Sequence, residues 1–258
     1  MNQVKAQIEG GQLLGAVKAQ LVTMAKPGVS FADIDTKATA LLMETGGQPS
    51  FSMVPGYHWS TCININDGIV HGIPHPDLHI KSGDLVTIDV GLYHRGFHTD
   101  TSTSLIVGKP HGEAAHFLEV GRQTLVKAIA VAIPGNKVWD ISHVIQTEIE
   151  AAGYNVVRDL TGHGVGKQLH MDPAITCYTT GSRDSSPTLS QGQAIAIEVM
   201  YTMGDYHLVK SPDDWTLSTR DHSLSAVFEE TIIVSSPHPQ VVTLAPWENN
   251  IFLIKSLE

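Results

Sequence analysis

The amino-acid sequence predicts a protein of the α+β class with two related halves. Stretches with the apolar spacing of amphipathic helices alternate with stretches rich in β-branched residues. A pattern in the first half of the chain returns in the second half. No linker rich in Pro, Ser or Gly separates the halves, so we expect them to share one core. With 258 residues, the chain is long enough to bury such a core.

Two helices are predicted at the start of the chain. Apolar residues at helical spacing indicate an amphipathic helix over residues 3–25, although three glycines within it lower its helix propensity. Lys26-Pro27-Gly28 ends this helix. A second helix is predicted from Asp33 to Glu44, and Gly46-Gly47 ends it.

Strands and a third helix follow. Residues 61–71 and 84–92 are rich in β-forming residues. Residues 97–107 return as another strand after a turn near His94-Arg95-Gly96. Residues 113–132 have the pattern of a helix.

An internal repeat relates the two halves. Pro27-Gly28, which precedes the helix that Asp33 opens, returns 107 positions later as Pro134-Gly135. The apolar segment around Asp89 returns 109 positions later around Glu198. Two collinear matches at nearly equal offsets predict pseudo-symmetric halves, over residues 26–108 and 133–235, within a single domain that spans residues 1–258.

The charge of the chain excludes some classes of partner. Lys and Arg number 16 against 26 Asp and Glu, so the formal charge is −10. This argues against binding to DNA, which needs a basic footprint, and against an anionic membrane surface. No apolar run approaches the ~18 residues of a membrane helix, and the first residues lack the apolar core of a secretion signal. We therefore expect a cytosolic protein.

Two acidic residues interrupt otherwise apolar strands. Asp89 lies between Ile88 and Val90, and Glu198 occupies the matching position of the second half. A lone buried carboxylate costs several kcal/mol unless a partner offsets the cost. Two carboxylates at equivalent positions would face each other across the pseudo-axis and repel, unless they share a proton or hold a cation. A metal site is the economical explanation.

Other residues suited to metal binding occur at the expected places. A hairpin that turns between residues 94 and 95 would put Asp100 nearly opposite Asp89. His163 lies between glycines, where a ligand can approach closely. Glu229 and Glu230 begin another strand, and because adjacent strand residues face opposite sides, only one should point into the site. The other is expected to be solvated or salt-bridged.

Two aspartates, two glutamates and one histidine form a carboxylate-rich set. Such a set suits divalent ions such as Mn(II), Fe(II), Co(II) or Zn(II). With bridging carboxylates it suits two ions about 3.5 Å apart, the arrangement of hydrolytic dinuclear sites.

Six motifs in order give the chain a family signature. They are Asn64 to Pro74, Ile88 to Gly91, Gly96 to Thr101, Thr161 to Gly166, Ile197 to Met200, and Trp215-Thr216 leading to Ser223 through Glu229. Over nearly its whole length the chain resembles type I methionine aminopeptidases, metallopeptidases of the pita-bread fold. The resemblance implies a curved central antiparallel sheet. It also implies removal of the initiator methionine from nascent polypeptides whose second residue is small.

The resemblance assigns a role to each expected ligand. Asp89 would chelate one divalent ion, Asp100 and Glu229 would bridge two ions, and His163 and Glu198 would bind the second. Glu198 would also relay the proton of the attacking water. The metal is open among Co, Mn, Fe(II) and Zn.

Further residues would act on the substrate. By resemblance, His71 contacts the scissile amide and assists the departing nitrogen, and His170 hydrogen-bonds the carbonyl oxygen of the tetrahedral intermediate. The apolar pocket for the methionine side chain would be lined by Tyr57, Cys62, Leu169 and Trp215. We expect a monomer that acts on nascent N-termini, with contacts to the ribosome left open.

The chain departs from the usual family pattern at four positions. Val199 stands where proline is usual, Leu169 where an aromatic is usual, Val227 where glutamine is common and Glu230 where histidine is common. None of these is an expected metal ligand. We expect them to affect pocket shape, metal preference and rate rather than the chemistry.

Two alternatives stay open. A Xaa-Pro aminopeptidase or prolidase shares the fold but usually carries an extra N-terminal domain, and only 26 residues precede Pro27. A catalytically silent peptide-binding relative would have lost metal ligands, whereas all five are present.

Overall fold

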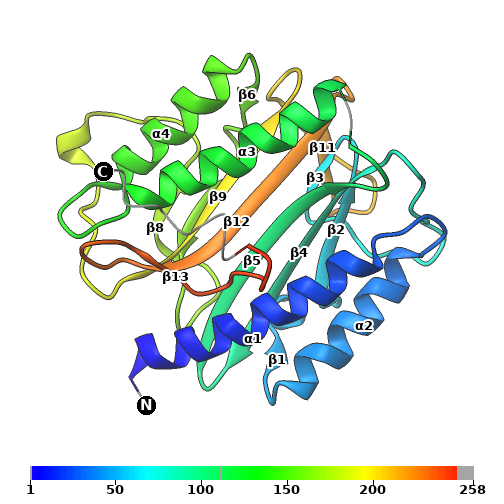
Figure 1. The fold of residues 1–258 in the computed structure, drawn as a ribbon, viewed down its shortest axis with the longest axis horizontal. Coiled ribbons are helices and arrows are strands. Elements are labelled where there is room, and N and C mark those ends of the chain that lie inside the picture. The colour runs from blue at the N-terminus through cyan, green and yellow to red at the C-terminus, as the bar shows by residue number, and fades with distance from the viewer. Residues whose placement is uncertain (1, 111, 249–258) are drawn as a thin grey trace.

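A layer of helices packs against one large sheet in the computed structural model, which describes residues 2–110 and 112–248 (Figure 1). The helices of this described part are α1 (Gln3–Met24), α2 (Phe31–Glu44), α3 (Gly112–Ala130) and α4 (Val138–Ala151). The predicted helices over 3–25, 33–44 and 113–132 are confirmed to within two residues at each end. None of these helices is long and apolar enough to span a membrane.

Every strand pairing in the large sheet is antiparallel. Its main path runs β1-β4-β5-β12-β9-β7-β8, and β2, β6 and β13 pair with β4, β9 and β12. The bounds are β1 (Gln48–Pro49), β2 (Thr61–Ile65), β4 (Leu85–His94), β5 (Phe97–Ile106), β6 (Asn155–Val156), β7 (Thr161–Gly164), β8 (Met171–Thr176), β9 (Ala194–Thr202), β12 (Ser225–Ile233) and β13 (Gln240–Val241). A smaller sheet joins β10 (Leu208–Lys210), β11 (Leu217–Thr219) and β3 (Gly68–Val70). Short 3-10 turns lie at Phe51–Met53 and Arg183–Ser185.

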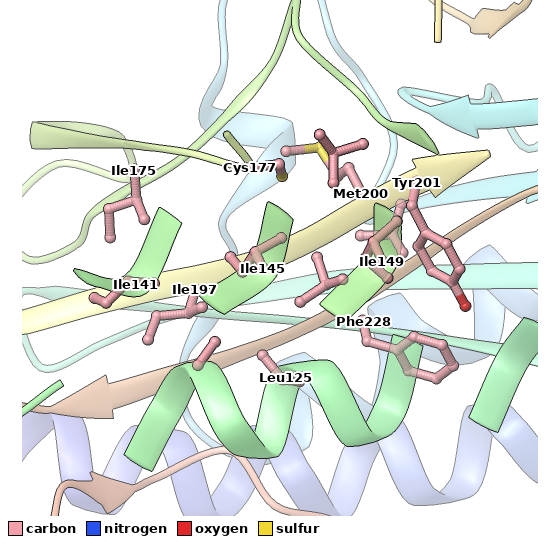
Figure 2. Packing of buried hydrophobic residues seen from close by; sticks show 14 of the residues in the cluster. Leu125, Ile141, Ile145, Ile149, Ile175, Cys177, Ile197, Met200, Tyr201 and Phe228 are labelled. Carbon is pink, nitrogen blue, oxygen red and sulfur yellow. The ribbon is translucent and has the colours of Figure 1, made fainter. Parts of the chain in front are cut away.

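The core lies between the helices and one face of the large sheet. Helix α1 packs over β4 and β5 with α2 beside it near β1 and β2, whereas α3 packs over β9 and β12 with α4 beside it near β6 and β8 (Figure 1). Figure 2 shows Ile145 and Ile149 of α4 and Leu125 of α3 near Ile197 and Phe228 of the sheet. Full burial of each such side chain contributes about 1.5–3 kcal/mol. Strand alternation then leaves the opposite face of β4 and β9 for Asp89 and Glu198.

Backbone hydrogen bonds repeat between the two halves. Gly28 N donates to Ile80 O, and at the matching place Gly135 N donates to Leu189 O. Asp33 and Asp140 occupy the same position in the first turn of α2 and α4, where each accepts from a backbone N–H. Gly83 N and Gly192 N bond in the same way to Val107 O and Val234 O. The sequence repeat therefore corresponds to repeated local structure.

The expected register of the β4–β5 hairpin is wrong, because each residue of β4 pairs with the residue of β5 that lies two positions later than expected. Asp100 pairs with Gly91, and Asp89 pairs with Ser102. The turn consists of Arg95 and Gly96, which both have positive φ, so it lies one residue later than expected. Asp89 and Asp100 still face the same side of the sheet, but they lie diagonally rather than opposite.

Two of the three glycines of α1, Gly11 and Gly15, are sites of close contact with the segment 242–248. A Cβ at Gly11 would lie 2.6 Å from Val242 O, and one at Gly15 would lie 2.3 Å from Leu244 O. Figure 1 shows the chain after β13 running toward α1. The low helix propensity of these residues is therefore offset by a packing contact that a side chain would block.

Candidate metal centre

The five expected metal ligands come from five different strands and line one cavity. Asp89 lies on β4, Asp100 on β5, His163 on β7, Glu198 on β9 and Glu229 on β12. Strand register explains how they meet. Asp89 pairs with Ser102, Ser102 with Glu229, and Glu229 with Glu198, which forms a row across four adjacent strands.

Three of the ligands are especially close. Asp100, His163 and Glu229 each offer a ligand atom, and these atoms all lie within 4.8 Å of one another. His163 Nε2 lies 3.5 Å from Glu198 Oε1 and 3.9 Å from Asp100 Oδ2. His163 Nδ1 lies 3.0 Å from Gly164 O, to which it donates when it carries the ring proton. That tautomer leaves Nε2 with a lone pair directed at the carboxylates.

The buried carboxylates of the cluster repel one another, and a bound cation would offset this repulsion. Burial raises the pKa of Asp89, Glu198 and Glu229 well above their usual values, and repulsion from Asp100 raises them further. Burial raises the pKa of Asp100 itself to about 7. Asp89 Oδ1 and Glu229 Oε1 are buried with no hydrogen-bond partner among the described residues. These unpaired oxygens and the mixed carboxylate–imidazole donor set fit a divalent metal ion.

Two further histidines border the same cavity. His71 follows β3 with a positive φ of 58°, and its ring makes an edge contact with Trp215 at 6.5 Å between centroids. His170 meets His163 at 4.5 Å, also edge to face. Burial lowers the pKa of His71, and nearby His170 lowers it further, so His71 is neutral at pH 7. Burial also lowers the pKa of His170.

An apolar wall completes the cavity. The four predicted pocket residues, Tyr57, Cys62, Leu169 and Trp215, pack together in one cluster. The Tyr57 and Trp215 rings meet edge to face at 5.0 Å between centroids. Tyr57 Oη donates to Thr61 O at 2.8 Å, which fixes the ring.

Sequence reasoning missed Phe51, which also lines this wall. Its ring lies against Gly91, because a Cβ there would come within 3.0 Å of Phe51 Cε1. Leu169 occupies a position that is aromatic in the resembling family, and Phe51 supplies an aromatic ring to the same cluster. The signal was Gly91, two residues after Asp89 on the same face of the strand, at a position where a strand usually carries a side chain.

None of the remaining departures lines the cavity. Val199 packs in the buried cluster under α3 and α4, whereas Val227 shares the face of β12 that carries Glu229 and pairs with Met200 of β9. Glu230 points to the helix-covered face, where it pairs with Lys18. The salt-bridged alternative for Glu230 is therefore confirmed, whereas the solvated one is wrong because Glu230 is buried.

The fold and the donor set together define a metallopeptidase, and comparison with known proteins gives the family. The model of metallopeptidase family M24 matches residues 7–236, so the chain belongs to that family. It therefore uses divalent metal, and it has the pita-bread fold.

Two proteins with sequences similar to this chain are named as methionine aminopeptidases. The methionine aminopeptidase of Clostridium acetobutylicum is 35% identical over 94% of this chain and 96% of its own. The solved methionine aminopeptidase of Thermotoga maritima is 33% identical with a TM-score of 0.91, over 94% of this chain and 96% of its own. The prolidase of Pyrococcus furiosus shares the fold at a TM-score of 0.69 and 22% identity, but this chain covers only 64% of it.

Proposed function

We propose that this protein is a metal-dependent aminopeptidase that removes the N-terminal methionine from nascent polypeptides whose second residue is small. The observation that carries the proposal is the carboxylate–histidine cluster that borders a small aromatic-walled pocket. A buried site of this kind suits a chain terminus, because only the end of a polypeptide can enter it. The names of the relatives support the same activity.

The proposed ligands lie in a row, with one residue at one end, two residues at the other end and two residues between them. Asp89 lies on one side of the row, His163 and Glu198 lie on the other, and Asp100 and Glu229 lie between. Five ligands with this spread support two divalent ions, from Co, Mn, Fe(II) or Zn, rather than one. A bound ion would lower the pKa of water toward neutrality and polarise the scissile carbonyl.

The chain's own residues would perform the proton transfers. Glu198 accepts the proton of the attacking water and holds it within the cavity. His71, neutral at pH 7, hydrogen-bonds the scissile amide and assists the departing nitrogen. His170 donates to the carbonyl oxygen as negative charge develops there. Tyr57, Cys62, Leu169 and Trp215, together with Phe51, hold the methionine side chain.

The proposal also covers the domain organisation, the cellular location and the oligomeric state of the enzyme. Residues 1–258 act as one catalytic domain, since β5 and β12 join the two halves within one sheet. The substrate is the N-terminus of a newly made chain, so the enzyme works in the cytosol, near the ribosome, as a monomer.

The alternative is a peptidase specific for Xaa-Pro bonds. The prolidases that match this chain share its fold at about one fifth identity, which says nothing of substrate. A silent binding protein is disfavoured because all five ligands are present and converge.

Release of free methionine from Met-Ala-Ser tests the proposal. Protein stripped with a chelator should be inactive, and Mn(II) or Co(II) should restore activity. Cleavage that survives stripping would contradict metal dependence. Mn(II)-restored cleavage of Ala-Pro-Ser, with none of Met-Ala-Ser, would support the alternative.

A further inference from the structure

A fully buried lysine lies on the helix-covered face of the sheet, opposite the face that carries the expected metal ligands. Lys18 of α1 is 0% exposed, and its Nζ lies 2.5 Å from Glu230 Oε1 and 2.8 Å from Glu248 Oε2. Burial alone lowers the pKa of Lys18, but the two carboxylates outweigh burial and raise it, so the ammonium stays charged. Because desolvation cancels most of the attraction in such a pair, stability alone is a weak reason for it.

Glu230 links Lys18 to the strands that carry the proposed ligands. Glu230 follows Glu229 on β12, so the two side chains face opposite sides of the sheet. Glu230 Oε2 lies 3.2 Å from Thr101 Oγ1 and also accepts from Thr243 Oγ1. Thr101 Oγ1 also donates to Glu229 O at 2.9 Å. The Glu230 carboxylate therefore contacts a hydroxyl that fixes the backbone of Glu229.

The same network reaches Asp100. Thr243 Oγ1 accepts from Thr231 N at 3.0 Å. Thr231 Oγ1 accepts from Asp100 N at 2.9 Å and donates to Asp100 O at 2.7 Å. On the side that faces β12, the backbone of Asp100 is thus held by the Thr231 side chain, whereas on its other side Asp100 pairs with Gly91 of β4.

The junction between β5 and β12 is short. Its paired residues are Glu229 with Ser102 and Glu230 with Thr101. Beyond them, the hydroxyls of Ser104 and Thr231 bond to backbone groups of the facing strand. The spacing between Asp100 and Glu229 therefore depends on side chains that surround Glu230.

We propose that Lys18 is a positioning residue for metal binding, which anchors Glu230 and so fixes Asp100 and Glu229 relative to each other. The inference rests on the metal-binding roles proposed for Asp100 and Glu229. Gly11 and Gly15 let the segment 242–248 approach α1, and Lys18 meets Glu248 of that segment one helical turn later. The contact thus ties α1 and the segment 242–248 to the junction.

Whether replacement of Lys18 weakens or strengthens the binding of a divalent cation distinguishes a positioning role from a purely electrostatic one. Loss of a buried positive charge near four carboxylates would by itself strengthen the binding of a divalent cation. Loss of the anchor should instead weaken it, because the two ligands are no longer held at the required spacing. A contact that serves stability alone would lower the melting temperature and leave metal affinity unchanged.

Mn(II) binding to metal-stripped protein, measured by calorimetry at a temperature where circular dichroism shows full folding, tests the inference. Two variants are compared with wild type: Lys18→Met, and Lys18→Met with Glu230→Leu, which removes the fully buried charge that Lys18→Met alone would leave unpaired. Each should weaken Mn(II) binding by about 10-fold or more, as expected for groups that orient metal ligands. Lys127→Met, which breaks the exposed Lys127–Glu148 pair, is the matched control and should bind as wild type does.

Wild-type or tighter Mn(II) affinity in either folded variant would overturn the inference. Glu229→Gln is measured alongside, because it tests the ligand role itself. If Glu229→Gln binds Mn(II) as wild type does, the proposed function fails. If Glu229→Gln loses affinity but the Lys18 variants do not, only the positioning role of Lys18 fails.

Discussion

In the proposed reaction, His71 acts on the substrate without binding metal. It borders the cavity from a loop, outside the row of carboxylates, and a positive φ directs it there. Its lowered pKa leaves it neutral, so it can both accept and donate a hydrogen bond at pH 7. In the proposed reaction it acts on the leaving nitrogen and not on the ions.

His71→Ala should therefore separate turnover from metal content. We expect kcat on Met-Ala-Ser to fall about 100-fold, the usual effect of losing a proton-transfer group. Metal per chain, measured by elemental analysis, should not change. His75→Ala, four residues later on the exposed part of the same loop, is the control and should match wild type. Normal turnover by His71→Ala would show that its assigned role is wrong.

Helix α1 forms as its apolar pattern predicts, although its glycines lower its helix propensity. Its glycines are poor helix formers, yet the helix runs from Gln3 to Met24 without a break. The reason is tertiary, since the backbone of segment 242–248 lies against Gly11 and Gly15.

Gly15→Ala should consequently destabilise the protein, although the same change raises intrinsic helix propensity by about 1 kcal/mol. The new Cβ would lie 2.3 Å from Leu244 O, and such overpacking costs about 1–3 kcal/mol. Urea unfolding measures the difference. Gln12→Ala, at an exposed position of the same helix, is the control and should be neutral or slightly stabilising. A Gly15→Ala variant more stable than wild type would contradict this contact.

The contacts of Asp140 in helix α4 predict how the stability of the protein depends on pH. Arg183 Nε donates to Asp140 Oδ1 at 2.6 Å, and Lys137 N donates to Oδ2 at 2.8 Å. The bond from Arg183 is the main cause that lowers the pKa of Asp140 below its usual 3.8. A lowered pKa in the folded state contributes stability above pH 3.8, and that contribution is lost as the pH falls through the folded-state value.

Asp140→Asn should therefore lower the stability at pH 7 by about 0.2–1 kcal/mol, the range for an exposed ion pair, and by less as the pH drops from 5 toward 3. Thermal melts of the two proteins across that range measure the gap. Asp77→Asn, a change at an exposed loop acid, is the control. A gap that stays constant from pH 7 to pH 3 would show that the charge of Asp140 contributes nothing.

At the scale of the whole molecule, most of the fold could be predicted because its determinants are local or repeated. The helices followed from apolar spacing, and the repeat around Asp89 and Glu198 indicated two halves and a shared site. Strand alternation also separated Glu229 from Glu230. The helices and the opposite faces of Glu229 and Glu230 need only the side-chain periods of 3.6 and 2, whereas the family resemblance supplied the pita-bread fold and the choice of Glu229 as the ligand.

What could not be predicted depended on the backbone geometry of one turn and on contacts between distant segments. The hairpin register was wrong because the turn is set by positive φ at both Arg95 and Gly96. Phe51 was missed because its place in the pocket depends on Gly91, 40 positions away. Lys18 was missed because its partners, Glu230 and Glu248, lie more than 200 positions further along the chain.

The molecule as a whole is expected to select both the first and the second residue of its substrate. The aromatic-walled pocket should hold methionine, and the space beside five converging ligands should admit only a small second side chain. Selection of both residues separates the proposed activity from that of a Xaa-Pro peptidase.

The most direct test is kcat/KM measured on one Mn(II)-loaded sample with Met-Ala-Ser, Met-Leu-Ser and Ala-Pro-Ser. The proposal predicts that Met-Ala-Ser exceeds each of the others by about 100-fold or more, because a crowded site excludes what it cannot fit. Equal values for Met-Ala-Ser and Met-Leu-Ser, or faster cleavage of Ala-Pro-Ser, would contradict it.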